Sequence, residues 1–169
     1  MYSQNAKRVT AYNYLREGKL DKAKTYIDEV AENSSTMGES KTWFYRGNIY
    51  YAIATAKEEK YRNLDSNALK IAIESFKKAF EIIDPHRNDN IDYIIGGLKN
   101  CGTTAYNRKK YEWAGDALES VFNYSMSLKK PIVESDMLFY AALSYHFIKN
   151  MAKAKELYIK LKDLNFPDP

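Results

Sequence analysis

Small and apolar residues recur along the chain at spacings of four and three, which indicates helices throughout. In a first kind of segment, a small residue follows a larger residue by four positions and precedes another by three. The instances are Lys7–Ala11–Tyr14, Trp43–Gly47–Tyr50, Leu98–Gly102–Ala105 and Leu138–Ala142–Tyr145. Because these spacings place three residues on one face of a helix, each segment is predicted to be helical with that face buried.

A second kind of segment begins with alanine and repeats the spacing with mostly bulky residues. Its instances are Ala23–Ile27–Val30, Ala72–Phe76–Ala79, Ala114–Leu118–Val121 and Ala154–Tyr158–Leu161. The two kinds alternate along the chain, which predicts an all-α fold of four helix-turn-helix units. Their approximate ranges are 4–36, 40–86, 94–128 and 132–165, with an insertion in the second unit at about 55–67.

Small residues on facing surfaces let two antiparallel helices approach closely while larger neighbours interdigitate beside them. A short turn is predicted between the helices of the first unit at Glu17-Gly18-Lys19. Unit ends are predicted at Asp84-Pro85, before Pro131 and at Phe166-Pro167, because the residue before a proline disfavours helix. One hairpin cannot bury its apolar face alone, so the units are expected to stack.

The run Trp43-x-x-x-Gly47-x-x-Tyr50, followed by Ala72, Phe76 and Ala79, resembles a tetratricopeptide repeat. The resemblance covers nearly the whole chain, about four units, although Lys7 stands in place of the usual aromatic residue and Ala105 in place of the tyrosine. It implies one array over 1–169, a right-handed superhelical α-solenoid. It also implies a scaffold that holds a protein or peptide partner.

The opening stretch, 5–50, is similar to the start of longer tetratricopeptide proteins that Gram-negative bacteria export to their envelope. This similarity implies a bacterial protein of the periplasm or cell envelope. The alternative is a cytoplasmic location.

The insertion contains a charged part followed by turn residues. The charged part, Ala56–Arg62, is predicted to lengthen the preceding helix, and either Asp65 or Ser66 is predicted to cap the next one. The insertion is interpreted as a tolerated surface segment, because loop closure costs little additional entropy. The alternative is an additional contact surface at one rim of the array.

Acidic and basic residues are interleaved, and the formal net charge is +4. A nucleic-acid-binding protein would usually concentrate positive charge on one face, so no nucleic-acid partner is expected. No apolar run approaches the roughly 20 residues that cross a bilayer, so no membrane insertion is expected. The first residues, Met1–Lys7, lack the apolar core of a signal peptide.

No grouping of side chains predicts catalysis. The histidines, His86 and His146, lie on different units and have no His or Cys partner at a metal-ligand spacing. The single cysteine, Cys101, is interpreted as a core residue because it lies beside Gly102 on a face predicted to be buried. We therefore expect no enzymatic activity, no cofactor and no metal ion.

Two polar or glycine-rich stretches resemble ligand loops only superficially. Gly96-Gly97-Leu98-Lys99 lacks the spacing and the hydroxyl residue of a phosphate-binding loop. The stretch 88–92 offers oxygen ligands but lacks the glycine and the closing glutamate of a calcium-binding hand. Neither stretch predicts a bound ion.

In a stack of helical hairpins, the first helix of each unit lines a concave inner groove. Positions three before, one after, and four or five after the small residue are predicted to face it. This candidate binding set is Arg8, Tyr12, Leu15, Arg16, Phe44, Asn48, Tyr51, Lys99, Thr103, Tyr106, Asn107, Phe139, Leu143, His146 and Phe147.

The set favours an extended peptide or a helix, with a carboxylate near Arg8 and Lys99 and an apolar end near Phe139 and Phe147. For Phe139, Leu143 and Phe147 the alternative is packing against a neighbouring helix. A different alternative for the whole chain is a spacer or docking domain of a larger transporter-associated or enzyme-associated protein, with no partner in the groove.

Some tetratricopeptide domains hold a C-terminal carboxylate with five basic and amide residues on three successive first helices. Arg8, Asn48 and Lys99 occupy three matching places. Tyr12 and Thr103 occupy the other two, where the family has an asparagine and a basic residue. The resemblance therefore matches this carboxylate clamp only in part.

The C-terminal end of the array is predicted to expose an apolar surface, because no polar capping helix follows Leu161 and Leu164. Either a second copy covers this surface, which makes a homo-oligomer, or the chain is part of a longer protein.

Overall fold

The computed structural model describes residues 4–83 and 90–166, and in these ranges the chain forms nine helices and no strand. The prediction of an all-α fold is thereby confirmed. The helices are α1 (Gln4–Arg16), α2 (Leu20–Glu32), α3 (Ser40–Thr55), α4 (Glu59–Arg62), α5 (Ala68–Ile82), α6 (Ile91–Asn107), α7 (Tyr111–Met126), α8 (Ser135–Phe147) and α9 (Met151–Asp163). The predicted unit end at Asp84-Pro85, His86, Asn88-Asp89 and Pro167 lie outside the described residues.

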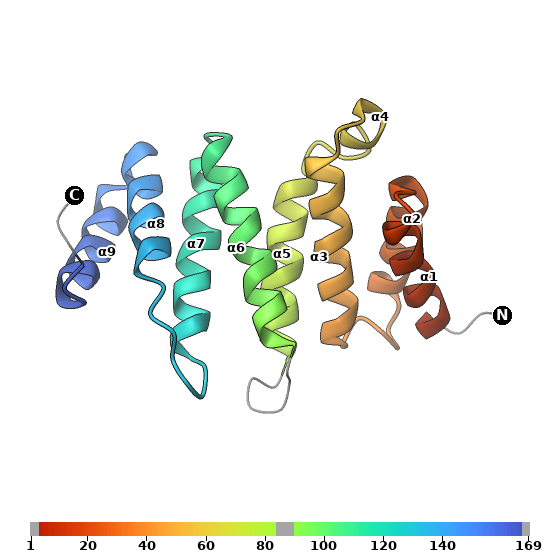
Figure 1. Cartoon of the computed structure of the whole chain (residues 1–169), viewed down its shortest axis with the longest axis horizontal. Helices are drawn as coiled ribbons and strands as arrows, with labels where there is room; N and C mark the ends of the chain where they lie inside the picture. The colour runs from red at the N-terminus through yellow and green to blue at the C-terminus, as the bar shows by residue number, and fades with distance from the viewer. Residues whose placement is uncertain (1–3, 84–89, 167–169) are drawn as a thin grey trace. The chain divides into compact units, whose positions relative to one another are not determined.

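The chain divides into two compact units. Of the described residues, 4–83 and 90–97 belong to the first unit, and 98–166 belong to the second. In the first unit α1 packs on α2, α3 packs on α5, and α2 also contacts α3. In the second unit α7 packs on α8, and α8 on α9 (Figure 1).

The first helix pair buries the small residues that the sequence marks. Ala11 on α1 and Ala23 on α2 are both fully buried. The predicted turn is observed, because α1 ends at Arg16 and α2 begins at Leu20. Gly18 in this turn has a φ of 72°, a backbone conformation that glycine adopts without steric cost.

The ring of Phe76 on α5 lies against two glycines. A Cβ atom added at Gly47 on α3 would lie 2.9 Å from the ring, and one added at Gly97 would lie 2.5 Å from Cε1 of the same ring. Both distances are too short for ordinary contact, so each missing side chain makes room for the ring. Gly47 facing Phe76 follows the predicted pattern, whereas the sequence does not indicate the role of Gly97.

The second unit repeats this arrangement. A Cβ atom added at Gly102 on α6 would lie 2.7 Å from Cδ2 of Leu118 on α7. Gly115 on α7 likewise leaves room for the ring of Tyr145 on α8, at 3.1 Å from its Cζ. Close approach at glycine therefore joins α6 to α7 and α7 to α8.

The last helix departs from the predicted pattern at one position. Ala154 and Leu161 are buried as expected, but the third inward residue is Leu157, which is fully buried. Tyr158 is only partly buried, whereas its counterparts Ile27, Phe76 and Leu118 are buried in the preceding hairpins. The physical reason is that no helix among the described residues covers this side of α9.

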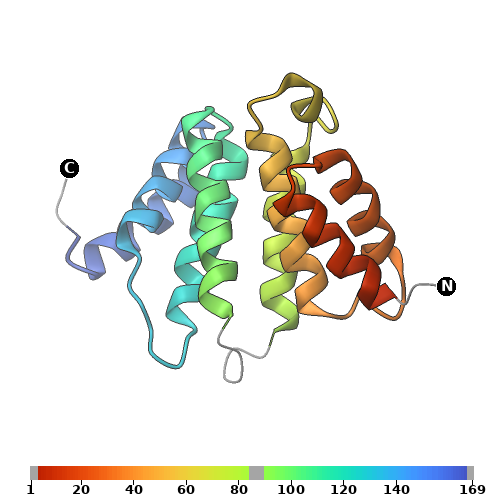
Figure 2. The same ribbon diagram turned by 45° about the vertical axis from the view of Figure 1, so that its right-hand side comes forward.

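The prediction that the charged part of the insertion lengthens α3 is wrong. The helix ends at Thr55, and a separate short helix, α4, lies near one end of α3 and α5 (Figure 2). The Arg62 guanidinium donates to the carbonyl oxygen of Ala56 at 3.0 Å and also to that of Lys57, which folds the segment back on itself. Neither predicted cap stands at the N-cap position of α5, which Asn67 occupies, while Asp65 Oδ1 accepts from the Asn67 amide at 2.9 Å.

Adding a methyl group at Gly97 should destabilise the protein, whereas the same change at the adjacent Gly96 should not. Gly97→Ala forces a Cβ atom into the Phe76 ring, an overpacking effect that costs about 1–3 kcal/mol. Gly96 has no atom within 4 Å of an added Cβ, so Gly96→Ala should stabilise the helix by about 0.5–1 kcal/mol. Urea unfolding of both variants measures the difference. Equal effects would contradict the contact with Phe76.

Candidate partner-binding surfaces

The predicted groove residues fall on both units. Arg8, Tyr12, Arg16, Phe44, Asn48 and Tyr51 belong to the first unit, and Lys99, Thr103, Tyr106, Phe139, Leu143 and His146 belong to the second. Each set lies on the first helix of a helix pair, as predicted. What these side chains can bind depends on which of them are already engaged within their own unit.

Arg8 is buried and uses its guanidinium within the protein. Its Nη1 donates to the carboxylate of Glu39 and, at 3.1 Å, to the hydroxyl of Thr42 on α3. Its Nη2 donates to Asn5 Oδ1 at 3.0 Å. These contacts hold α1 on the N-terminal end of α3, and they leave little of the guanidinium for a ligand carboxylate.

Other predicted residues of the first unit also contact each other. Tyr12 stacks on Tyr45 with ring centroids 4.6 Å apart, and the Asn48 side-chain amide donates to the Phe44 carbonyl oxygen at 2.8 Å. Phe44 and Tyr45 line a depression of about 280 Å³ whose other lining residues are Ser40, Lys41, Ile83, Asn90 and Ile94. The Ser40 hydroxyl is already used, because it donates to the Ala79 carbonyl oxygen at 2.7 Å.

Lys99 in the second unit is likewise paired. Its ammonium lies 2.8 Å from Glu134 Oε2, at the residue before α8. The two cations to which the sequence assigned a partner carboxylate, Arg8 and Lys99, therefore both contact carboxylates of the protein itself. Each pair joins the first helix of one hairpin to the start of another first helix.

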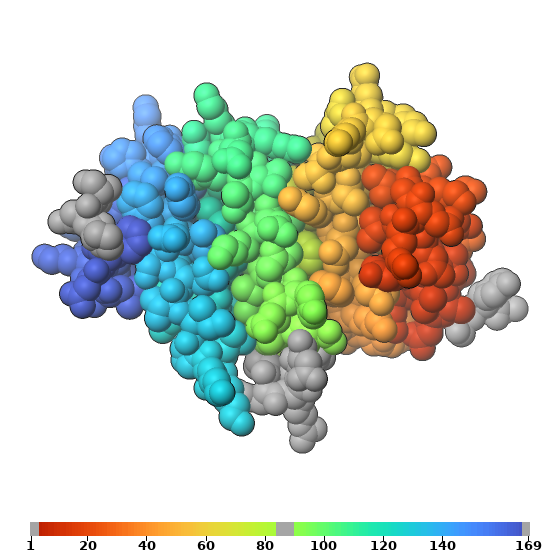
Figure 3. All heavy atoms as spheres, viewed as in Figure 1, coloured from red at the N-terminus to blue at the C-terminus, as the bar shows by residue number. Residues whose placement is uncertain are grey.

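The second unit instead presents a cluster of aromatic rings, which we call the aromatic surface: Tyr106, Tyr111, Tyr140 and Phe147. Tyr106 lies edge-on to Tyr140 at 5.1 Å and to Tyr111 at 5.6 Å, and Tyr111 lies 4.6 Å from Phe147. Although each of these rings contacts another ring of the cluster, Tyr140 is 41% exposed and Phe147 is 49% exposed. Figure 3 shows residues of α8, which carries both, at the surface of the second unit.

Local structure explains why these rings meet. Tyr140 and Phe147 are seven residues apart on α8, so they lie on one face two helical turns apart. Tyr106 and Tyr111 flank the turn between α6 and α7, where Lys109 has a φ of 58°. Further rings extend the cluster at its margins, since Phe139 stacks on Phe166 at 5.5 Å and His146 lies 6.3 Å from Phe147.

Tyr111 and Tyr140 were missed by the sequence analysis. The predicted groove positions lie at fixed distances from the small residue of each first helix, and Tyr140, two residues before Ala142, is at none of these distances. Tyr111 belongs to a second helix, whereas the predicted groove is lined by first helices. The available signal was the large number of tyrosines, 15 in the chain, since tyrosine suits surfaces that are partly apolar and partly wet.

A tyrosine–carboxylate contact joins successive hairpins in each unit. The Tyr50 hydroxyl on α3 donates to Asp28 on α2 at 2.8 Å, and Arg46 Nε donates to the same carboxylate at 3.2 Å. The Tyr145 hydroxyl on α8 donates to Glu119 on α7 at 3.1 Å. Burial, followed by the neighbouring carboxylate, raises the pKa of both tyrosines, so both hydroxyls keep their proton and remain donors well above neutral pH.

Of the histidines and the cysteine, His146 on α8 and Cys101 on α6 lie within the described residues. Cys101 is fully buried, and burial raises the pKa of its thiol, which disfavours the reactive thiolate. Within 4–83 and 90–166, no group of three or more His, Cys, Asp and Glu side chains is placed to hold a metal ion. No helix in the described part of the chain is both long enough and apolar enough to span a membrane.

Comparison with known proteins adds no family or activity to this geometry. No protein-family model matches the chain, and no curated protein matches it.

Replacing Arg8 should cost stability, whereas replacing Arg16 on the same helix should not. Arg8→Ala removes hydrogen bonds to Glu39, Thr42 and Asn5, and bonds that involve a charged group contribute about 1.5–3 kcal/mol. Arg16 is exposed, and exposed substitutions usually change stability by less than about 0.5 kcal/mol. Urea unfolding of both variants measures the costs. An Arg8→Ala variant as stable as the parent protein would contradict the structural role of Arg8.

Proposed function

We propose that the protein is a tetratricopeptide-type scaffold that holds a peptide of another protein on the aromatic surface of its second unit. The repeated helix pairs with glycine or alanine at their contacts support the repeat class. Binding rather than catalysis is proposed, and the protein would act by bringing its partner to a defined place. The spacer or docking role is the alternative, and it requires no bound partner on this surface.

The observation that carries the proposal is the exposure of rings that already have aromatic neighbours. Burying Tyr140 and Phe147 further would be favourable by about 25 cal/mol per Å² of apolar area removed from water. Because each ring is held by others, little side-chain freedom remains to be lost on binding. Preordered aromatic side chains of this kind commonly dominate the binding energy of an interface.

The chemistry of the surface defines the peptide. Four adjacent rings favour an aromatic or aliphatic anchor residue, while the tyrosine hydroxyls can hydrogen-bond to the peptide backbone. A terminal carboxylate is not assigned to Arg8 or Lys99, since both contact carboxylates of the protein. The proposed recognition therefore depends on apolar contact and not on the partial carboxylate clamp.

Removing the two exposed rings should weaken peptide binding. Peptides are selected from a random display library on the immobilised whole protein, and their affinities are measured by fluorescence anisotropy. For Tyr140→Ala combined with Phe147→Ala we expect at least a tenfold loss of affinity, because truncating an anchor residue typically costs more than about 1.4 kcal/mol. The matched control is Tyr93→Ala, which removes a 66% exposed tyrosine of the first unit.

The control should bind the selected peptides as the parent protein does. Circular dichroism measures whether the double variant keeps its helices. We expect that it does, because both replaced rings are substantially exposed. Unchanged affinity in the folded double variant would refute the aromatic surface as the binding site. Failure of the library to give any binding peptide would favour the spacer role.

A further inference from the structure

The outer face of α9 combines exposed apolar residues with two lysines. Met151 is 56% exposed and Ile159 is 52% exposed. With Ala154, Tyr158, Lys155 and Lys162 of α9 and His146 of α8, they line a shallow depression of about 430 Å³. The six α9 residues follow one another at spacings of three, one, three, one and three, so they form a single stripe along the helix.

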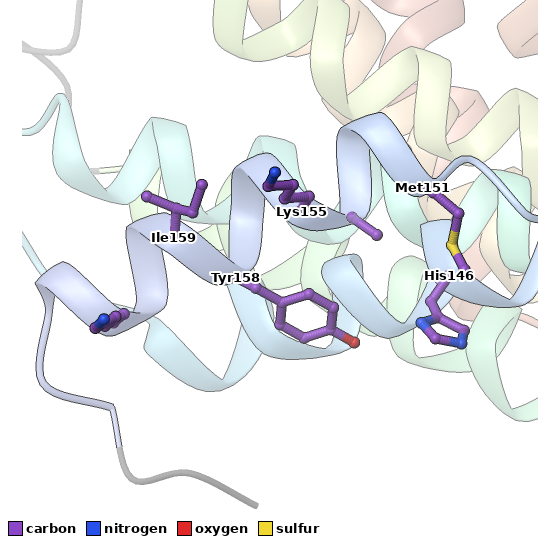
Figure 4. A pocket seen from close by; sticks show the side chains of 7 residues that line it. His146, Met151, Lys155, Tyr158 and Ile159 are labelled. Carbon is purple, nitrogen blue, oxygen red and sulfur yellow. The ribbon is translucent and has the colours of Figure 1, made fainter.

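Figure 4 shows how these side chains lie. The Tyr158 ring extends toward His146 and Met151, while Lys155 and Ile159 project from α9 on the other side of the stripe. Apolar side chains therefore recur along the stripe, at Met151, Tyr158 and Ile159. From Met151 to Lys162 the stripe is about 16 Å long, which matches about three turns of a helix laid along it.

Equivalent positions on two preceding second helices, α2 and α7, show what this face does there. Eight residues after the alanine that begins each pattern, α2 has Ala31 and α7 has Phe122, and both are buried. The helix that packs next to them is α3 in the first case and α8 in the second. On α9 the same position is Lys162, which is exposed. The outer face of α9 is thus the counterpart of a surface that elsewhere receives a helix.

The acidic residue that the internal contacts use is missing from this face of α9. Five residues after the same alanine, α2 has Asp28 and α7 has Glu119, which accept hydrogen bonds from the incoming helix. On α9 this position is Ile159. Lys155 and Lys162 have no ion-pair partner in the described part of the chain, whereas Lys153 and Lys160 are paired with glutamates. An incoming helix must therefore bring an apolar stripe and carboxylates.

From this charge pattern we propose that the outer face of α9 docks an acidic amphipathic helix of a separate partner protein. Carboxylates on that helix pair with Lys155 and Lys162, and its apolar stripe covers Met151, Tyr158 and Ile159. The site adjoins the margin of the aromatic surface at His146 and serves a different ligand.

A second copy of the chain fits this face poorly. Two copies packed through α9 would bring Lys155 and Lys162 of one copy toward the same lysines of the other. End-to-end stacking on α1 does not supply the missing charge, because α1 contains no Asp or Glu. The charge pattern therefore selects a different protein over the self-association that the sequence suggested.

The test uses a designed helical peptide of four turns with a leucine stripe flanked by glutamates, labelled with fluorescein. A second peptide of the same length carries lysines in place of the glutamates. Fluorescence anisotropy with the whole protein should show binding of the acidic peptide. The affinity for this peptide should be at least tenfold weaker in the variant with Lys155→Glu and Lys162→Glu. That variant should gain affinity for the lysine peptide.

The charge-matched control is the variant with Lys129→Glu and Lys130→Glu, which changes two exposed lysines of the same unit outside α9. It should bind the acidic peptide within twofold of the parent protein. If both double variants lost affinity for the acidic peptide equally, the loss would be explained by net charge alone, and the proposed site would be refuted. The variant with Tyr140→Ala and Phe147→Ala should keep acidic-peptide binding, which separates this test from that of the aromatic surface.

Sedimentation velocity over a range of protein concentrations tests whether a second copy of the chain binds to the outer face of α9. The proposal expects a monomer whose sedimentation is unaffected by Ile159→Glu. A concentration-dependent dimer that Ile159→Glu abolishes would assign the face to a second copy and overturn the proposal.

Discussion

Close approach of paired helices, made possible where one helix has glycine or alanine opposite a large side chain, determines the rest of this structure. Phe76 fits between α3 and α6 because Gly47 and Gly97 lack side chains, and Leu118 fits against Gly102 for the same reason. A helix fixed through one face has no freedom to rotate, so the residues on its remaining faces are fixed as well. The exposed aromatic rings and the lysine-bordered stripe of α9 are consequences of those buried contacts.

The charged residues of the first helices serve mainly to join one hairpin to another. Arg8 with Glu39, Arg46 with Asp28 and Lys99 with Glu134 each connect different helices. A cation that is paired in this way is poorly suited to attract a ligand. The proposed recognition therefore uses groups without such pairing, which are aromatic rings on the second unit and two lysines on α9.

The sequence predicted the helices and their small-residue contacts because both depend on spacing along the chain. Ala11 and Ala23, for example, are buried as their spacing required. Spacing gives the face of a helix but not the partner opposite it, so the engagement of Arg8 by Glu39 could not be predicted. The prediction from spacing was also wrong in the insertion, where hydrogen bonds from Arg62 fold the chain back on itself. The contact of Gly97 with Phe76 was missed because the two residues belong to different predicted units.

The most direct test of the central claim is a nuclear Overhauser measurement on the labelled whole protein. Strong cross-peaks are predicted from the Phe76 ring protons to the α protons of Gly47 and Gly97, and from the Leu118 methyl groups to the α protons of Gly102. These contacts arise only if the helices meet at their glycines. A well-dispersed helical spectrum with assigned resonances and none of these cross-peaks would contradict the account.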